Sequence, residues 1–248
     1  MLKKERQAYI IQQINVHNKV MSSDLSVQLD VSEDTVRRDL QELAEEGKLI
    51  KVHGGALSKS FHFTLETQTI YSLPAKRSIA YKAVNLIHDG MMVILSGGTT
   101  IRELVKALPP DLNATFITVS VPIALELLEH PTAEVIFVGN RLLKNAQMAV
   151  GAEVIQRLSQ IKADLCFLGT NSIDANFGIT DLEWEIIEVK RAMMKCSSKT
   201  VSLAIAEKLN TIQKLQVCPP ESIDLLITEL EEDNLLLQPY KEKGILCL

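Results

Sequence analysis

The segment SGGTT at residues 96–100 has the residue types best suited to holding an anion. It follows an apolar run at residues 91–95 and precedes a helical pattern at residues 101–108. Backbone N–H groups and hydroxyls at a helix N-terminus can cradle a phosphate. The segment has no lysine, which distinguishes it from a nucleotide-binding P-loop, and no G-x-G-x-x-G follows a strand. A tight turn that needs glycine is the alternative interpretation.

Three other polar side chains are predicted to lie near this loop. Ser120 precedes a helical pattern, where a plain N-cap explains it equally well. Asp174 comes shortly after the strand predicted at residues 164–168, where an Asx turn is an equal alternative. Lys208 could reach a phosphate, although a surface lysine is the commoner case. We expect all three at the edge of the sheet where the loop lies.

The adjacent arginines Arg37 and Arg38 suit a different ligand, DNA. They lie in a helical pattern whose apolar positions fall on another face. Arginine forms bidentate bonds with guanine edges and binds phosphate through its charge. Ser32 precedes this helix as an N-cap. A solvated helix face with ion pairs to nearby acidic residues is the alternative interpretation.

The elements around these arginines form a winged helix-turn-helix pattern. A helix is predicted at residues 4–16, a short second helix follows Ser22 and Ser23, and the third helix ends at Gly47. A short strand at residues 49–53 then ends in a glycine turn. This order places the third helix in the major groove and the strand, as a wing, on the DNA backbone or minor groove. The predicted DNA-binding residues are Ser32, Thr35, Arg37, Arg38, Lys51 and His53.

The rest of the chain has a different pattern. From residue 74, short apolar strands alternate with helices, which indicates a parallel sheet covered on both faces. The predicted fold is therefore mixed: a small all-α winged helix-turn-helix domain at 1–57, and an α/β domain with a largely parallel sheet at 74–248. Residues 58–73 are predicted to be a linker, with a strand around 61–63.

Composition limits the classes of function. The net charge is −5, and residues 1–56 hold 8 Lys/Arg against 9 Asp/Glu, a balance of −1. DNA affinity must therefore come from the placement of basic residues and from oligomerisation. The four cysteines include no C-x-x-C, and the apolar runs are too short to span a bilayer. We expect a cytoplasmic protein with no membrane partner, no cofactor, no metal site and no catalytic residues.

The motif VSEDTVRRDL at residues 31–40, followed by VHGGA at 52–56, resembles the DNA-binding end of DeoR-family transcriptional regulators. The SGGTT loop, ADLCFLG at 163–169 and EVKRAM at 188–193 resemble their effector domain. The resemblance implies a C-terminal domain similar to sugar-phosphate isomerases that binds a phosphorylated sugar or similar small anionic metabolite. It also implies a homo-oligomer, dimer or tetramer, on double-stranded operator DNA.

Carried over to this sequence, the resemblance implies that the chain regulates a sugar or carbohydrate operon, as a repressor. The implied effector-binding residues are Gly97, Gly98, Thr99, Thr100, Ser120, Asp174 and Lys208. Two alternatives stay open: a sugar-phosphate isomerase with an added domain, and a DNA-binding oligomer that responds to no ligand.

The sequence departs from the family pattern at several polar positions. Ser96 stands where the family has aspartate before its glycine loop, and Ile186 replaces an acidic residue. The segment at residues 205–208 keeps only the lysine of an Asp-x-Ser-Lys pattern, and Thr-Asn-Ser reads TVS at residues 118–120. Several groups that would fix sugar hydroxyls are absent, so the pocket is expected to differ in ligand or affinity.

Overall fold

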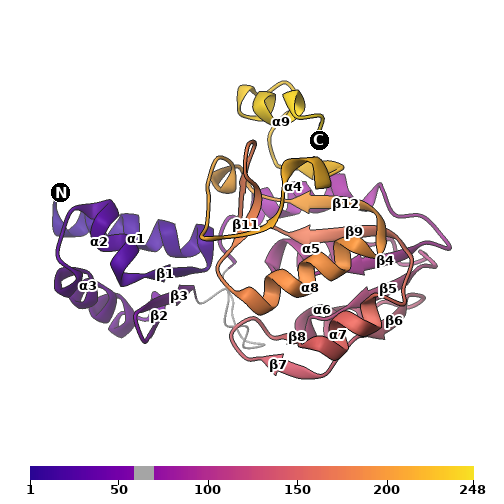
Figure 1. The fold of residues 1–248 in the computed structure, drawn as a ribbon, viewed down its shortest axis with the longest axis horizontal. Helices are drawn as coiled ribbons and strands as arrows, with labels where there is room; N and C mark the ends of the chain where they lie inside the picture. The colour runs from indigo at the N-terminus through magenta and orange to yellow at the C-terminus, as the bar shows by residue number, and fades with distance from the viewer. Residues whose placement is uncertain (59–69) are drawn as a thin grey trace. The chain divides into compact units, whose positions relative to one another are not determined.

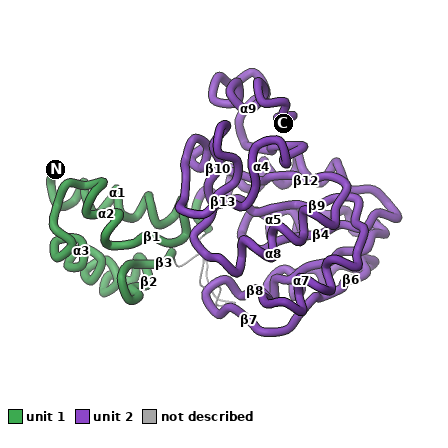
Figure 2. Tube along the Cα trace, in the orientation of Figure 1, with its two compact units in different colours: residues 1–71 green, residues 72–248 purple. Residues whose placement is uncertain are grey.

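The computed structural model describes residues 1–58 and 70–248. The chain divides into two compact units, Met1–Tyr71 and Ser72–Leu248 (Figure 2). The strand expected around residues 61–63 lies outside the described residues, and the domain boundaries expected at 57 and 74 stay predictions.

In its described residues, the first unit contains three helices and three short strands (Figure 1). In chain order they are α1 (Lys3–His17), β1 (Lys19–Met21), α2 (Ser22–Leu29), α3 (Glu33–Glu45), β2 (Leu49–Val52) and β3 (Gly55–Ser58). The strands form an antiparallel sheet in the order β1-β3-β2. The predicted winged helix-turn-helix domain is confirmed, with β2 as the expected strand and β1 and β3 as additional strands. Strands of three or four residues are too short to produce a clear alternation of apolar and polar residues.

The helices of this unit pack around one small apolar core. Its fully buried members include Ile10, Ile14, Leu25, Val36, Leu40 and Leu43. Asp39 is also buried, and its carboxylate accepts hydrogen bonds from Arg6 at 2.5 and 3.2 Å. This pair joins α1 to α3 and fixes which face of α3 points outward.

The second unit contains a seven-stranded sheet covered by helices. Its larger helices are α4 (Leu73–Val84), α5 (Thr99–Lys106), α6 (Val121–Leu127), α7 (Ala152–Leu158), α8 (Trp184–Lys195) and α9 (Gln238–Glu242). The strands of the main sheet are β4 (Met92–Leu95), β5 (Thr115–Thr118), β6 (Glu134–Phe137), β9 (Ala163–Gly169), β12 (Ser197–Leu203), β14 (Leu225–Ile227) and β15 (Leu246–Cys247). Their order is β15-β14-β12-β9-β4-β5-β6, and every neighbouring pair is parallel. The predicted parallel α/β domain is confirmed.

Two small antiparallel sheets were not expected. One is the hairpin β7 (Arg141–Leu143) with β8 (Met148–Val150). The other joins β10 (Ser172–Asp174), β11 (Gly178–Asp181) and β13 (Leu215–Cys218). Their strands are short, and β13 comes from a distant part of the chain, so no local pattern indicates the pairing.

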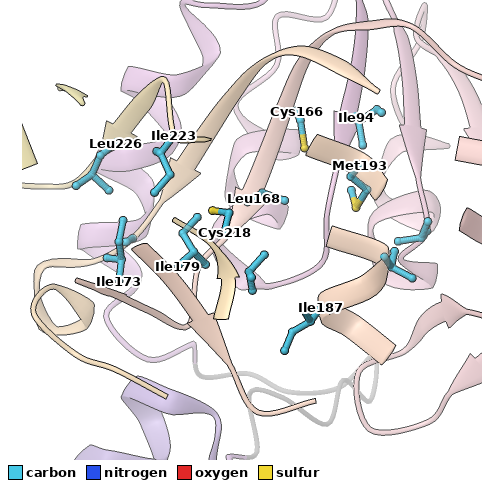
Figure 3. Packing of buried hydrophobic residues seen from close by; sticks show 14 of the residues in the cluster. Ile94, Cys166, Leu168, Ile173, Ile179, Ile187, Met193, Cys218, Ile223 and Leu226 are labelled. Atoms are coloured by element: carbon cyan, nitrogen blue, oxygen red, sulfur yellow. The ribbon is translucent and has the colours of Figure 1, made fainter. Parts of the chain in front are cut away.

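The core of this unit lies between the main sheet and the helices α7 and α8 (Figure 3). Ile94, Cys166 and Leu168 from the strands meet Ile187 and Met193 from α8. The helices α4, α5 and α6 contact one another in sequence and cover the other face. All four cysteines are free, and burial raises the pKa of each thiol, which leaves them poor nucleophiles.

Candidate functional site: a nucleic-acid face and an anion pocket

The outer face of α3 presents the predicted recognition residues. The Ser32 hydroxyl accepts a hydrogen bond from the backbone N–H of Thr35 at 3.2 Å and so caps the helix. Beyond this cap, the side chains of Arg37 and Arg38 are 58% and 81% exposed. Ser32, Arg37 and Arg38 therefore lie on the solvent face of one helix, as the spacing predicts.

Both arginines have ion-pair partners on their own helix, as the alternative interpretation expects. Arg37 lies 2.8 Å from Glu33, and Arg38 lies 3.7 Å from Asp34. Exposed pairs of this spacing stabilise a helix by only about 0.3–0.5 kcal/mol. Each arginine therefore loses little free energy when it leaves its carboxylate partner to bind a DNA phosphate or a guanine edge.

The wing places a third basic residue against the same helix. Lys51 on β2 donates a hydrogen bond from Nζ to Gln41 Oε1 on α3 at 2.8 Å. Gln41 is one turn beyond Arg37, so the helix and the wing form one continuous polar face. His53 is exposed in the turn after β2. The prediction of DNA-binding residues did not include Gln41, although its helical spacing from Arg37 could have identified it.

The cap on α3 gives a local test. Replacing Ser32 with alanine should destabilise the N-terminus of α3 by about 0.5–2 kcal/mol, because the Thr35 N–H loses its acceptor. Hydrogen exchange measured by mass spectrometry should show faster exchange of the first amides of α3. Ser23→Ala is the control, since Ser23 is exposed and is not the N-cap of α2. Unchanged exchange in Ser32→Ala would contradict the capping role.

In the second unit, the SGGTT loop lies at the carboxyl end of β4 and leads into α5. The helix begins at Thr99, two residues earlier than expected, so both threonines lie in its first turn. Gly98 is the N-cap with a φ of 116°, a conformation that L side chains rarely adopt, and the space beside its Cα is open. The loop is thus both a turn that requires glycine and an open helix N-terminus.

Ser96 connects this loop to the neighbouring strand. It is fully buried, and its hydroxyl accepts a hydrogen bond from the Gly169 N–H at 2.8 Å. Gly169 approaches the loop so closely that a Cβ there would lie 2.4 Å from the Gly97 carbonyl oxygen. The carboxyl ends of β4 and β9 therefore lie against each other. A serine suits this buried position because its hydroxyl carries no charge.

Ser120 lies beside Gly97 of this loop. It is buried at the N-cap of α6, but its side chain makes no cap hydrogen bond. A Cβ placed on Gly97 would lie 3.4 Å from Ser120 Oγ and 3.0 Å from Met148 Sδ. The structure therefore brings Ser120 next to the loop, and it does not support the plain N-cap interpretation.

Asp174 has a different environment. Its carboxylate accepts hydrogen bonds from the N–H groups of Asn176 and Phe177 at 2.8 and 3.0 Å, in the turn between β10 and β11. This is the Asx-type turn considered as the alternative. The structure shows no contact between Asp174 and the loop.

Lys208 is buried, so the alternative of a surface lysine is wrong. Only 8% of its surface is exposed, and Nζ donates to the Thr170 carbonyl oxygen at 2.8 Å. Thr170 follows Gly169 directly, which places this ammonium beside the loop. Burial, followed by the charges of Lys76 and Lys190, lowers the pKa of Lys208 to about 7.

The sequence prediction missed Lys76 and Lys190, which complete a cluster of three buried lysines. Lys76 on α4 is 4% exposed, and burial lowers its pKa to about 8 despite the opposing charges of Glu103 and Glu207. Lys190 on α8 donates to the Gly169 carbonyl oxygen at 3.1 Å. No local signal marked Lys76, whereas Lys190 lies within the EVKRAM motif. We call Lys76, Lys190 and Lys208 the lysine cluster.

Asp181 balances one member of the lysine cluster. Its carboxylate lies 2.8 Å from Lys190 Nζ and also accepts hydrogen bonds from Asn171 and the Leu182 N–H. Burial alone would raise the pKa of Asp181, but the charge and hydrogen bond of Lys190 hold it below the ordinary value. Lys208, by contrast, has no carboxylate at ion-pair distance among the described residues. Lys208 is therefore the member of the lysine cluster that has no counter-ion of its own among the described residues.

Gly98 gives the second local test. Gly98→Ala should destabilise the second unit by about 1–3 kcal/mol, because alanine is strained at this φ. In a thermal-shift titration with phosphorylated sugars, the variant should show a smaller stabilisation than the unaltered chain, since the loop must relax. Gly90→Ala is the matched control: its φ of +79° is also positive with open space beside it, but it lies in the turn before β4, outside the site. Equal loss of ligand response in both variants would contradict the role of the loop.

No helix of the described residues has the length and apolar character needed to cross a membrane. Within residues 1–58 and 70–248, no group of three or more His, Cys, Asp or Glu side chains is placed to hold a metal ion.

A winged helix-turn-helix unit followed in the chain by an α/β unit with a glycine loop at the carboxyl edge of its sheet is the architecture of a DNA-binding transcriptional regulator with a sensor domain. Residues 6–61 match the model of the DeoR-like helix-turn-helix domain, and residues 72–230 match the DeoR C terminal sensor domain. The chain belongs to the DeoR family.

Curated relatives align over nearly the whole chain and are described as regulators. The HTH-type transcriptional regulator GolR of Listeria innocua is 33% identical over 97% of this chain and 96% of its own length. The HTH-type transcriptional repressor GlcR of Bacillus subtilis is 32% identical over 92% and 89%. GlpR of Haloferax volcanii, also an HTH-type transcriptional regulator, is 32% identical over 92% and 91%. The family and these relatives are transcriptional regulators rather than enzymes.

Proposed function

We propose that this regulator represses an operon of sugar or carbohydrate metabolism in the cytoplasm and releases its operator when a phosphorylated sugar binds. The single observation that carries the proposal is the buried amino group of Lys208, which has no carboxylate partner among the described residues and lies beside an open glycine loop. A buried cation without a counter-ion is costly, and an anionic ligand would supply the missing charge. Repression is supported by the relative GlcR, whose name describes a repressor.

The DNA-binding part of the proposal rests on α3 and the wing. Arg37 and Arg38 read base edges or bind phosphates, Lys51 and His53 bind the backbone or the minor groove, and Ser32 and Thr35 contact the DNA near the start of α3. The unit has a net charge of −1, so one copy binds DNA weakly. A dimer or tetramer doubles the contacts, and the operator then has half-sites separated by whole helical turns.

The effector part rests on the two neighbouring strand ends of β4 and β9. Gly97, Gly98, Thr99 and Thr100 offer N–H groups and hydroxyls to the phosphate, and Lys208 with Lys76 offers charge. Ser120 borders the same space. Asp174 would contact the ligand only by giving up its turn hydrogen bonds, so we assign it the weakest role of the predicted set.

The test combines both parts. The full chain is mixed with fluorescent DNA from the promoter of its own operon, and anisotropy is measured with and without each of a set of phosphorylated pentoses and hexoses. We expect specific binding that one or a few of these compounds weaken at least tenfold. Specific DNA binding that no phosphorylated sugar changes, with no thermal stabilisation by any of them, would favour a ligand-blind regulator.

A further inference from the structure

Binding a phosphate does not by itself require three buried lysines such as those of the lysine cluster. Its three lysines come from α4, α8 and the segment after β12, and all three side chains are more than nine-tenths buried. Lys190 and Lys208 donate to the adjacent carbonyl oxygens of Gly169 and Thr170. The charges of Lys76 and Lys190 act on Lys208 and disfavour its protonation. A buried ammonium that is repelled by neighbouring cations is disfavoured unless negative charge is present.

The acidic groups around the cluster leave Lys208 without an ion pair of its own among the described residues. Asp181, on β11, is engaged by Lys190 at 2.8 Å. Glu103, on α5, faces Lys76 but also pairs with Arg77 at 3.2 Å and Lys106 at 3.4 Å. Glu207 acts on Lys76 and Lys208 and accepts a hydrogen bond from Ser72. Lys208 itself donates to a neutral carbonyl oxygen.

We propose that the anion and a proton enter this pocket together, so that effector binding is coupled to protonation of the lysine cluster at Lys208. This inference rests on the proposed function, because the anion is the phosphate of the effector. Without ligand, a neutral Lys208 amine avoids both the burial of a charge and the repulsion of Lys76 and Lys190. A bound dianion reverses this balance, and Lys208 then takes up a proton from solvent. The sensor therefore responds to the effector and to pH through one site.

The physical basis is linkage between two binding equilibria. The pKa of Lys208 is about 7 in the unliganded protein, so the amine is largely protonated at pH 6 and largely neutral at pH 8.5. A ligand that binds the protonated form must lose affinity as the pH rises through this range. The pKa of Lys76, about 8, extends the same effect to higher pH.

Inorganic sulfate is the sharpest probe, because it stays a dianion from pH 6 to pH 9 and takes up no proton itself. The full chain is titrated with sodium sulfate at constant ionic strength, and binding is measured by isothermal titration calorimetry and thermal stabilisation. From pH 6.5 to pH 8.5 we expect the association constant to fall by roughly 20-fold, as a lysine with a pKa of about 7 loses its proton. At pH 8, the calorimetric heat should vary between buffers of different ionisation enthalpy, which reports proton uptake.

Variants and outcomes separate this inference from the proposed function. Lys208→Arg keeps a permanent charge, so its sulfate affinity should fall much less with pH, by only the part that Lys76 contributes. Lys199→Arg at an exposed position should behave like the unaltered chain. Sulfate binding in the unaltered chain that is independent of pH and of buffer would overturn the coupling and leave the anion pocket in place. No binding of sulfate or of phosphorylated sugars at any pH would overturn both.

Discussion

Replacing Arg37 and Arg38 together with alanine should weaken operator binding by about 2–6 kcal/mol, which corresponds to a loss of roughly 30-fold or more. Both side chains are exposed on one face of α3, and their present partners are weak surface ion pairs. The fold should survive, because the buried contacts of this helix come from Val36, Leu40 and Leu43. Fluorescence anisotropy on operator DNA, with circular dichroism as a check on folding, measures the effect.

The control for this prediction removes two positive charges elsewhere. Arg157 and Lys199 are exposed in the second unit, and the double variant Arg157→Ala/Lys199→Ala has the same net charge as the arginine variant. It should bind the operator nearly as well as the unaltered chain. The single variants distinguish two roles: loss of a base contact relaxes specificity, whereas loss of a phosphate contact reduces the salt dependence. Unchanged binding in the Arg37/Arg38 variant would rule out α3 as the recognition helix.

Lys208→Met should have two opposite effects, a more stable protein and a regulator that no longer responds to its effector. The apolar side chain removes the cost of burying an amine, and we expect unfolding at pH 7 to require about 1–3 kcal/mol more. The same change removes the unpaired cation of the pocket, so phosphorylated sugars should no longer release the operator. DNA binding without ligand should be unchanged.

The pH dependence of this stabilisation has a definite sign. Burial lowers the pKa of Lys208 from 10.5 to about 7, so between these values the unfolded chain binds more protons than the folded one. The reduction in the free energy of unfolding caused by Lys208 is therefore largest below about pH 7 and disappears as the pH approaches 10.5. The advantage of Lys208→Met should shrink across the same window in urea denaturation. A variant that is less stable at pH 7 and still responds to ligand would contradict the assignment.

The sequence determined most of the DNA-binding face. An N-cap, a helical repeat of apolar residues and a glycine at the end are local signals, and they set which face of α3 carries Arg37 and Arg38. The parallel sheet was also predictable, because buried parallel strands are continuous apolar runs such as residues 91–95. The short strands β1, β7 and β10 were not, since each is formed by pairing with a partner rather than by its own pattern.

The anion pocket was predictable only in part. The SGGTT loop was identified from its composition and its place between a strand and a helix, whereas the surroundings of Lys208 were not. The sequence alone made a surface lysine the commoner case, because a long cationic side chain usually stays in water.

Tertiary structure decided the chemistry of this pocket. Lys76, Thr170, Lys190 and Lys208 come from α4, the end of β9, α8 and the segment after β12, and they meet only because the parallel sheet brings these ends to one edge. The apolar stripe of α3 is formed by residues three or four positions apart, so the sequence by itself predicts which side chains of this helix face solvent. Burial of a charge and its pKa depend on groups more than a hundred residues apart, and only the assembled fold brings these together.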